Sequence, residues 1–141
     1  MSSGLFQVDE EGLLFISPAI HDWGPILARG IDAVIDLEGG LDHGVPTVPD
    51  GLVYLYYPIY DEDLPDPDKL DAVVALGVAL VRARKRVLSH CGMGFNRSAL
   101  VAGLILCRLG HAGPDVVKRL RLARPGALFN ERFCAHLQSL R

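Results

Sequence analysis

Cysteine is scarce in this sequence, and this scarcity narrows the classes of protein to which the chain can belong. The 141 residues contain three cysteines, Cys91, Cys107 and Cys134, an odd number without any paired spacing. Small secreted domains that depend on disulfides contain more cysteines, at regular spacings. We therefore expect no disulfide framework and a reducing, cytoplasmic environment, which a reactive thiol would require.

Long apolar runs and an excess of positive charge are also missing. Hydrophobic residues make up 50% of the chain, but no stretch combines the length and the lack of charge that a membrane span needs. Residues 1–6 have neither the basic region nor the apolar stretch of a secretory signal. The formal net charge of -3 at pH 7 disfavours a nucleic-acid binder or a protein that adheres to anionic membranes. The composition is typical of a globular protein, and the length predicts one domain over residues 1–141.

One distinctive stretch is present, from Ser89 to Ser98, with the sequence SHCGMGFNRS. The apolar pair Val87-Leu88 precedes this stretch, and an apolar helical pattern from Ala99 to Leu109 follows it. The expected order is therefore strand, glycine-rich loop and helix. Because successive N–H groups that curl in front of a helix N-terminus form a concavity for anions, this loop predicts a phosphate-binding site.

Two side chains of the loop have chemistry that matches such a site. Arg97 has a planar guanidinium, which suits bidentate contact with phosphate oxygens. Cys91 lies in the same positive field, which favours the reactive thiolate over the thiol. A thiolate beside a phosphate cradle predicts phosphoryl transfer to sulfur, followed by hydrolysis. The competing interpretation is a structural buried cysteine before an ordinary turn. It requires a set of residues to fall into this pattern by chance: Gly92, Gly94, Arg97 and Ser98.

The pattern His90-Cys91-x-x-Gly94-x-x-Arg97-Ser98 resembles the phosphate-binding loop of the cysteine-dependent protein tyrosine phosphatases. The surrounding chain is similar to their small dual-specificity branch. This resemblance implies that Cys91 is the nucleophile, that Arg97 holds the phosphate, and that Ser98 hydrogen-bonds the Cys91 sulfur when the phosphoenzyme breaks down. His90 is then expected to be a buried support. Phosphate binding is expected along the loop at Gly92, Met93, Gly94, Phe95, Asn96 and Arg97.

A general acid is expected on the acidic segment 60–68. Asp66 precedes a proline and is typical of a helix N-cap, and Asp68 falls in the first helical turn, so both have structural reasons to be there. Asp61 and Asp63 remain as candidates. In the phosphatases that the chain resembles, the acid closely follows a strand in a Pro-x-x-Asp-like context, which the proline three residues before Asp61 matches. We therefore favour Asp61 over Asp63.

The remaining patterns predict an α/β fold. Strands are expected at 6–8, 13–16, 31–37, 52–59 and 87–89, the first two as a hairpin. Helices are expected at 18–29, 67–83, 97–109, 115–123 and 131–140. We predict a central, mainly parallel sheet of about four to five strands, flanked by helices as in the dual-specificity phosphatases. The Cys91 loop would lie at the carboxyl end of a strand, where such sheets bind ligands.

Several residues outside the loop are interpreted as structural. Asn130 is a good N-cap for the last helix. Cys107 and Cys134 fall on apolar helical patterns and are expected in the core. The segment 38–50, which contains Asp42, is expected to be a solvated loop.

Other functions remain open for the same loop. Low-molecular-weight phosphatases and related arsenate reductases carry their cysteine near the N-terminus, unlike Cys91. Rhodanese-like sulfur transferases also use a cysteine loop before a helix, but the acidic segment and Ser98 favour a phosphatase. A phosphate-binding module without catalysis would lack the nucleophile, the arginine or the acid. Inositol-lipid phosphatases often carry lysine within the loop, and no cation lies between Cys91 and Arg97, which disfavours an inositol phosphate as substrate.

No metal ion or other cofactor is expected, because the sequence has no clustered His, Asp or Cys spacing typical of a metal site. The expected partners are a phosphorylated protein or a small phosphomonoester as substrate, with phosphate or another oxyanion in the Cys91 loop. We expect a monomer, and neither a nucleic acid nor a membrane as a partner.

Overall fold

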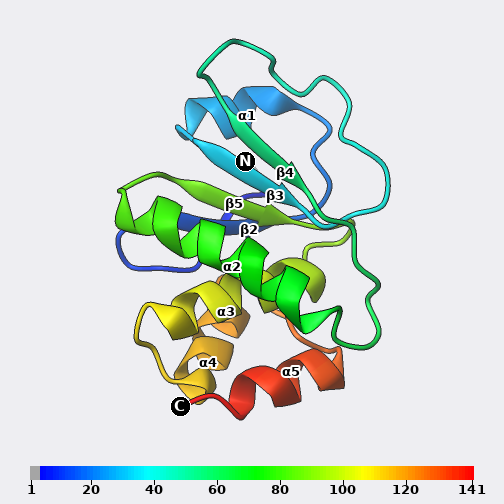
Figure 1. Cartoon of the computed structure of the whole chain (residues 1–141), viewed down its shortest axis with the longest axis vertical. Coiled ribbons are helices and arrows are strands. Elements are labelled where there is room, and N and C mark those ends of the chain that lie inside the picture. Colours follow the sequence, from blue (N-terminus) through cyan, green and yellow to red (C-terminus); the bar gives the residue numbers. More distant parts are fainter. Residues whose placement is uncertain (1–3) are drawn as a thin grey trace.

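A five-stranded sheet forms the centre of the molecule in this computed structural model, which describes residues 4–141 (Figure 1). The strands are β1 (Phe6–Gln7), β2 (Leu14–Ser17), β3 (Ala33–Asp36), β4 (Val53–Tyr56) and β5 (Val87–His90). Their order across the sheet is β1-β2-β5-β3-β4. β1 and β2 pair in antiparallel fashion, as predicted for the hairpin, and all other neighbours are parallel. The predicted sheet is therefore confirmed.

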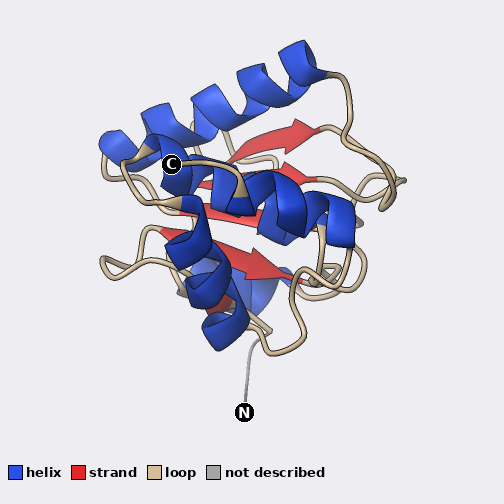
Figure 2. Cartoon of the chain, turned by 90° about the horizontal axis from the view of Figure 1, so that it is seen from below, coloured by secondary structure: helices blue, strands red, loops and turns tan. Residues whose placement is uncertain are grey.

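Helices cover both faces of the sheet. They are α1 (Trp23–Ala28), α2 (Pro67–Arg82), α3 (Arg97–Arg108), α4 (Gly113–Ala123) and α5 (Glu131–Gln138). α1 lies alone on one face, and the other four helices form a layer on the opposite face (Figures 1 and 2). α3 packs directly on β2 and β5, and α2, α4 and α5 pack around it. This central position explains the nearly continuous apolar sequence of α3, because a helix that is covered on most sides buries most of its surface.

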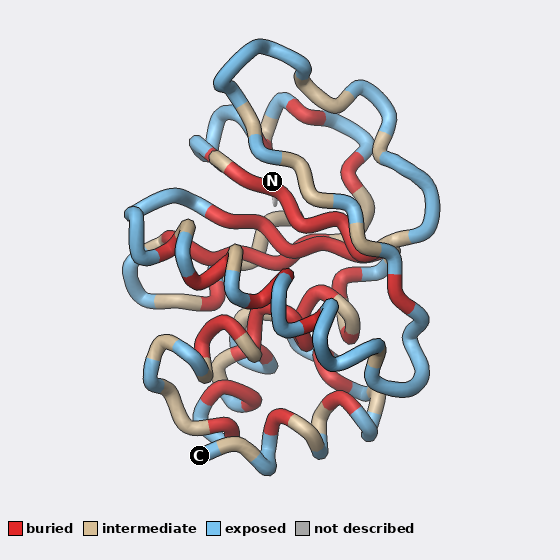
Figure 3. The backbone as a smooth tube through the Cα atoms, in the orientation of Figure 1, coloured by how far each residue is buried: buried red, intermediate tan, exposed pale blue. Residues whose placement is uncertain are grey.

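Successive residues of the central strands enter two separate cores, because side chains alternate between the faces of a sheet. In β2, Leu14 and Ile16 pack towards α3, whereas Phe15 packs towards α1. In β5, Val87 and Leu88 divide between the two cores in the same way. Figure 3 shows the central strands buried along their length, which rigidly fixes the point where β5 enters the Cys91 loop.

Some boundaries and burials differ from the predictions. The helix expected at 18–29 spans only Trp23–Ala28, because the Asp22 side chain accepts a hydrogen bond from the Gly24 backbone N–H at 2.9 Å and caps the helix there. α4 begins at Gly113, two residues before the predicted start. Cys107 and Cys134 are half-buried rather than core residues, since each lies at the edge of its helix's apolar face. Among residues 4–141, no helix has both the length and the apolar character of a membrane span.

Candidate active site

The Cys91 loop lies at the carboxyl end of β5, between that strand and α3. β5 is flanked by β2 and β3, so the loop opens at the middle of the sheet edge rather than at its periphery. Parallel sheets bind ligands at this edge, because the strands deliver their following loops there and the next helix presents its N-terminus. The predicted sequence of strand, glycine-rich loop and helix is therefore confirmed.

The carbonyl groups of the loop point outward, where neighbouring segments bind them. The carbonyls of Gly92, Met93 and Phe95 accept hydrogen bonds from the Ala19 N–H (3.1 Å), the Arg124 guanidinium (3.2 Å) and the Leu128 N–H (2.9 Å), respectively. Within residues 4–141, no backbone N–H from Gly92 to Asn96 donates a hydrogen bond to another protein atom. Outward carbonyls leave the N–H groups facing the concave side, which is the arrangement of a backbone anion site.

Gly94 is required at the position where the loop contacts β2. Its φ of +74° lies in the left-handed region, which L residues with a side chain adopt at a cost. A Cβ atom at this position would approach the Pro18 backbone nitrogen to 2.7 Å and the Ser17 carbonyl carbon to 2.8 Å. The loop and the end of β2 are therefore in backbone-to-backbone contact, and only glycine fits between them.

Cys91 lies at the base of the loop and is 2% exposed. Its Sγ atom is 3.4 Å from the Ser98 Oγ atom, within hydrogen-bond distance. Ser98 is fully buried in the first turn of α3, and its backbone carbonyl accepts a hydrogen bond from the Ser89 hydroxyl at 3.0 Å. The structure thus brings together Cys91 and Ser98, the two residues that the sequence places on either side of the loop.

Arg97 extends its guanidinium across the loop and is held there by two acceptors. Its Nη2 atom lies 2.9 Å from Glu38 Oε2, and its Nη1 atom donates to the Ile59 carbonyl at 3.3 Å. The Arg97 Nε atom is buried and has no protein partner among the described residues. Two acceptors therefore fix the plane of the guanidinium, while Nε remains free to donate to a bound anion. The role of Glu38 was missed in the sequence, because it lies 59 residues from Arg97.

Asp61 lies against the phosphate loop. Its two carboxylate oxygens accept hydrogen bonds from the side-chain amides of Asn96, at 2.9 Å, and Asn130, at 2.8 Å. Asp63 turns away and forms an exposed ion pair with Arg132. Of the two candidates for the general acid, only Asp61 contacts the loop through a hydrogen bond in the described chain.

Asp66 and Asp68 have structural roles, as predicted. The Asp66 side chain accepts hydrogen bonds from the backbone N–H groups of Asp68 and Lys69 and caps α2. Asp68 lies in the first turn of that helix, where a carboxylate complements the helix dipole.

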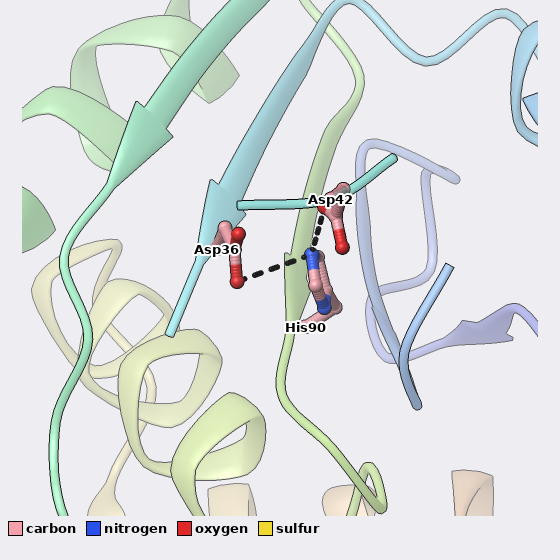
Figure 4. Close-up of side chains that lie close together, drawn as sticks. All are labelled: Asp36, Asp42 and His90. Atoms are coloured by element: carbon pink, nitrogen blue, oxygen red, sulfur yellow. Dashed lines mark hydrogen bonds and ion pairs between the residues drawn. The ribbon is translucent and has the colours of Figure 1, made fainter. Parts of the chain in front are cut away.

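His90 is fully buried between two aspartates, as Figure 4 shows. Its Nε2 atom is 2.7 Å from Asp42 Oδ2 and 3.4 Å from Asp36 Oδ1. The Tyr54 hydroxyl donates to Asp36 and lies 3.2 Å from Asp42 Oδ2. Burial raises the pKa of the Asp36 carboxyl above its ordinary value, although the hydrogen bond from Tyr54 opposes this shift. The pKa of Tyr54 is also raised, by burial and by its hydrogen bond to Asp36.

This cluster overturns one expectation from the sequence. Asp42 is not part of a solvated loop, because its side chain is only 8% exposed and it binds His90. Asp36, Asp42 and His90 present potential metal-ligand atoms within 4.8 Å of one another, a proximity that their positions in the sequence conceal. The hydrogen bonds among these residues and Tyr54 already engage the atoms that face one another, so the cluster is explained as a support for His90 next to Cys91.

The entrance to the loop carries apolar side chains. Met93 is 68% exposed at the tip of the loop. Phe95 instead packs beneath the Arg124 guanidinium, with the carbon atom of that group 4.0 Å from the ring centroid, and beside Phe129, with the two ring centroids 5.8 Å apart. Met93 and Phe129 are therefore exposed apolar side chains at or beside the loop, whereas Phe95 packs against Arg124 and Phe129.

No protein-family model matches the sequence, and no curated protein matches it. Solved structures match along nearly the whole chain. Human DUSP28 is 27% identical, with 98% of this chain and 93% of that chain covered and a TM-score of 0.79. A mouse dual specificity phosphatase complexed with zinc tungstate is 29% identical, with 98% and 86% covered and a TM-score of 0.80. Tk-PTP in its active form is 26% identical, with 98% of both chains covered and a TM-score of 0.75.

These likenesses extend beyond the loop motif to the complete arrangement of sheet and helices. A shared fold alone would leave the function open, because one fold supports many functions. Here the fold delivers a cysteine, a backbone cradle and an arginine to the carboxyl end of the central strand. The chain is an enzyme of the cysteine-dependent protein tyrosine phosphatase superfamily, and within it the chain is similar to the small dual-specificity phosphatases.

Proposed function

We propose that this phosphatase cleaves phosphate monoesters with Cys91 as the nucleophile, Arg97 as the phosphate clamp and Asp61 as the general acid. The observation that carries this proposal is that neighbouring segments bind the carbonyls of Gly92, Met93 and Phe95, while the N–H groups of Gly92–Asn96 have no partner among the described residues and so are available to an anion beside Cys91. A phosphoryl group bound by these N–H groups would lie next to the Cys91 sulfur, and phosphoryl transfer depends mainly on such positioning.

In the first step, the Cys91 thiolate attacks phosphorus and the bond between phosphorus and the ester oxygen breaks. The loop N–H groups and Arg97 Nε bind the three non-bridging oxygens, where negative charge is concentrated. The leaving oxygen takes a proton from Asp61, which is supported by the position of this carboxyl group beside Asn96 of the loop. A cysteinyl-phosphate and the free alcohol or phenol result.

In the second step, a water molecule attacks phosphorus and the bond between sulfur and phosphorus breaks. Asp61, now a carboxylate, accepts a proton from that water. The electron pair of the broken bond returns to sulfur, and the Ser98 hydroxyl, 3.4 Å from Cys91 Sγ, stabilises the resulting thiolate. Inorganic phosphate then leaves, and the Cys91 thiolate is ready for another cycle.

Glu38 enters this scheme as a partner of Arg97. Its carboxylate and the Ile59 carbonyl bind the two Nη atoms of Arg97, so the guanidinium does not have to be oriented when substrate arrives. Preorganised donors are more effective than mobile ones, because no free energy is spent on ordering them during the reaction.

The entrance supports an aryl phosphomonoester, such as phosphotyrosine in a protein, as the substrate. Met93 and Phe129 are exposed at the loop, and Tyr60, next to Asp61, is 81% exposed. These side chains provide apolar surface for an aromatic ring, whereas the loop between Cys91 and Arg97 lacks the cation that a highly charged inositol phosphate would favour. All of the proposed catalytic groups come from a single chain, in keeping with a monomeric enzyme of one catalytic domain.

The test compares Cys91→Ser with Cys107→Ser, a control on a half-buried cysteine of α3. We expect Cys91→Ser to lose all turnover of 4-nitrophenyl phosphate and still to be stabilised by tungstate in a thermal shift assay. Cys107→Ser should keep wild-type turnover. Turnover by Cys91→Ser would refute Cys91 as the nucleophile. If no form of the enzyme turned over substrate or bound tungstate, the loop would have been misassigned as an anion site. A comparison of phosphotyrosine, phosphoserine and phosphothreonine peptides with inositol phosphates then identifies the substrate class.

A further inference from the structure

Asn130 has two roles in the structure, only one of which its sequence position reveals. Its side-chain oxygen accepts hydrogen bonds from the backbone N–H groups of Arg132, at 3.1 Å, and Phe133, at 3.2 Å, and so caps α5. Its side-chain nitrogen donates to Asp61 Oδ1 at 2.8 Å and to the Glu62 backbone carbonyl at 3.1 Å. One amide group therefore connects the start of α5 to the segment that carries Asp61.

Asn96 makes a parallel connection from the phosphate loop. Its side-chain nitrogen donates to Asp61 Oδ2 at 2.9 Å, and its side-chain oxygen accepts a hydrogen bond from the Asn130 backbone N–H at 2.9 Å. Asn96 is 2% exposed, so its amide is removed from water, whereas Asp61 itself is exposed. Both carboxylate oxygens of Asp61 are thus bound, one by the phosphate loop and one by the N-terminus of α5.

The orientation of both amides is determined by backbone groups. An asparagine amide can in principle be turned so that its oxygen and nitrogen exchange places. In Asn130 the oxygen must face the N–H groups at the start of α5, and in Asn96 it must face the Asn130 N–H. Because only donors occupy these positions, both NH₂ groups are directed to Asp61, and the aspartate has a single position in which both are satisfied.

We propose that Asn130, together with Asn96, is a positioning residue that holds the general acid against the phosphate loop before substrate binds. This inference rests on the proposed function, in which Asp61 protonates the leaving group. A general acid acts only within hydrogen-bond reach of the leaving oxygen, so its contribution of about 10² to 10⁴-fold depends on such placement. The acid segment is therefore already assembled on the loop, without a closing movement.

The competing interpretation is that Asn130 merely caps α5. Asn130→Ser and Asn130→Asp separate the two roles, because serine and aspartate are both good N-caps. The serine side chain is too short to reach Asp61, and an aspartate at this position places a second carboxylate against the Asp61 carboxylate. Arg132→Gln is the matched control, since it removes the exposed ion pair with Asp63 at the same junction, where such a pair contributes little.

The experiment measures kcat and KM with phenyl phosphate, which has a poor leaving group, and with 4-nitrophenyl phosphate, which has a good one. For Asn130→Ser and Asn130→Asp we expect kcat with phenyl phosphate to fall by about 10 to 100-fold, part of the full contribution of the acid. With 4-nitrophenyl phosphate, kcat should change by less than about threefold, since that leaving group needs little protonation. Arg132→Gln should match the wild type on both substrates.

A double-substitution cycle with Asp61→Asn tests the mechanism of this effect. In the Asp61→Asn background, Asn130→Ser should cause no further loss with phenyl phosphate, because the group that it positions has already been removed. Amide hydrogen exchange in residues 60–64 should also be faster in Asn130→Ser than in the wild type. An equal loss on both substrates, or a lower Tm with an unchanged leaving-group dependence, would reduce Asn130 to a helix cap and overturn the proposal.

Failure of the inference is distinguishable from failure of the proposed function. If Asp61→Asn shows the leaving-group effect and Asn130→Ser does not, Asp61 is the acid and the positioning role is refuted. If Asp61→Asn itself lacks the effect, the acid has been misassigned and the positioning role is refuted with it.

Discussion

Gly94→Ala is expected to inactivate the enzyme while leaving it folded. The new methyl group would have to occupy a residue with a φ of +74°, 2.7 Å from the Pro18 backbone nitrogen and 2.8 Å from the Ser17 carbonyl carbon. Neither neighbour can rotate away, because both atoms belong to the backbone at the end of the buried strand β2. The loop itself must therefore change its conformation.

The magnitude follows from two costs. A left-handed conformation costs an alanine roughly 1–2 kcal/mol. Inserting a methyl group into a closely packed position typically adds about 1–3 kcal/mol. The active conformation of the Gly94→Ala loop would thus be disfavoured by about 2–5 kcal/mol. If the loop can adopt another conformation, the population of the active one falls by a factor of about 30 or more. This is less than the usual free energy of unfolding of about 5–15 kcal/mol, so the rest of the domain stays folded.

Gly110→Ala is the matched control for this prediction. Gly110 has a φ of +110°, and among residues 4–141 a Cβ atom there would have no heavy atom within 4 Å apart from its own chain neighbours. This variant should carry backbone strain without a clash and lie outside the active site, so Tm should fall while kcat/KM stays at the wild-type value. The assay is kcat/KM for 4-nitrophenyl phosphate and phenyl phosphate, with circular dichroism to monitor unfolding.

For Gly94→Ala we expect kcat/KM to fall by at least about 30-fold on both substrates alike, because the anion cradle is lost rather than the acid. Wild-type kcat/KM in Gly94→Ala would refute the close contact between the loop and β2. A loss confined to phenyl phosphate would instead locate the damage at the Asp61 segment.

Three further predictions concern single side chains. Arg97→Lys keeps the charge but loses the planar fork, so kcat/KM and the affinity for vanadate should both fall by about 100-fold or more; near-normal values would make Arg97 a helix-start residue only. Ser98→Ala should slow the breakdown of the cysteinyl-phosphate, seen as a burst of 4-nitrophenol before a slow steady state, whereas an equal fall in both phases would contradict its role. Asp36 has a raised pKa in the folded protein, so its stabilising contribution is present below about pH 3.8 and is lost as pH rises. The Tm of Asp36→Asn relative to the wild type should therefore increase between pH 4 and pH 7, and a decrease would refute the direction of the shift.

Much of the fold could be predicted because hydrophobic periodicity is a local property. The strand at 33–36 lies within the predicted apolar segment, and the strand at 14–17 is shifted by one residue from its prediction. α2 follows the predicted N-cap, Asp66. The first helix was predicted too long, because residues 18–21 have an ambiguous pattern and contact the phosphate loop instead of forming a helical turn. The Ala19 N–H donates to the Gly92 carbonyl, which is far away in the sequence. Such a contact produces no periodic pattern of hydrophobic residues from which it could be predicted.

The residues of the candidate site also fall into those that a local sequence pattern reveals and those that depend on distant contacts. Cys91, Arg97 and Ser98 were identifiable because one short loop contains them. Glu38 was not, since the carboxylate that orients Arg97 comes from the segment after β3 and follows no fixed spacing. Asn130 was identified only as a helix cap, because capping is a local property and its contact with Asp61 is not.

The surroundings of His90 could not be predicted for a further reason. Asp42 lies in a segment rich in glycine and proline, which usually predicts exposure. The hydroxyl of Tyr54 on β4 accepts a hydrogen bond from the Asp42 backbone N–H at 3.1 Å, which brings the Asp42 side chain inward to His90. A buried carboxylate of this kind depends on a partner supplied by another strand, so composition alone misclassifies it.

The loop motif therefore predicts the chemistry but not the geometry that the chemistry needs. The shape of the loop is imposed by the hydrogen bonds that its carbonyls accept from Ala19, Arg124 and Leu128. Ala19 and Leu128 donate through backbone N–H groups, which almost any residue at those positions could supply, so their identity conveys no sign of the contact. Arg124 is the exception, because its side chain both donates to the Met93 carbonyl and stacks over Phe95. The Cys-x₅-Arg sequence can hold its N–H groups inward only while these three donors, on two distant segments, hold its carbonyls outward.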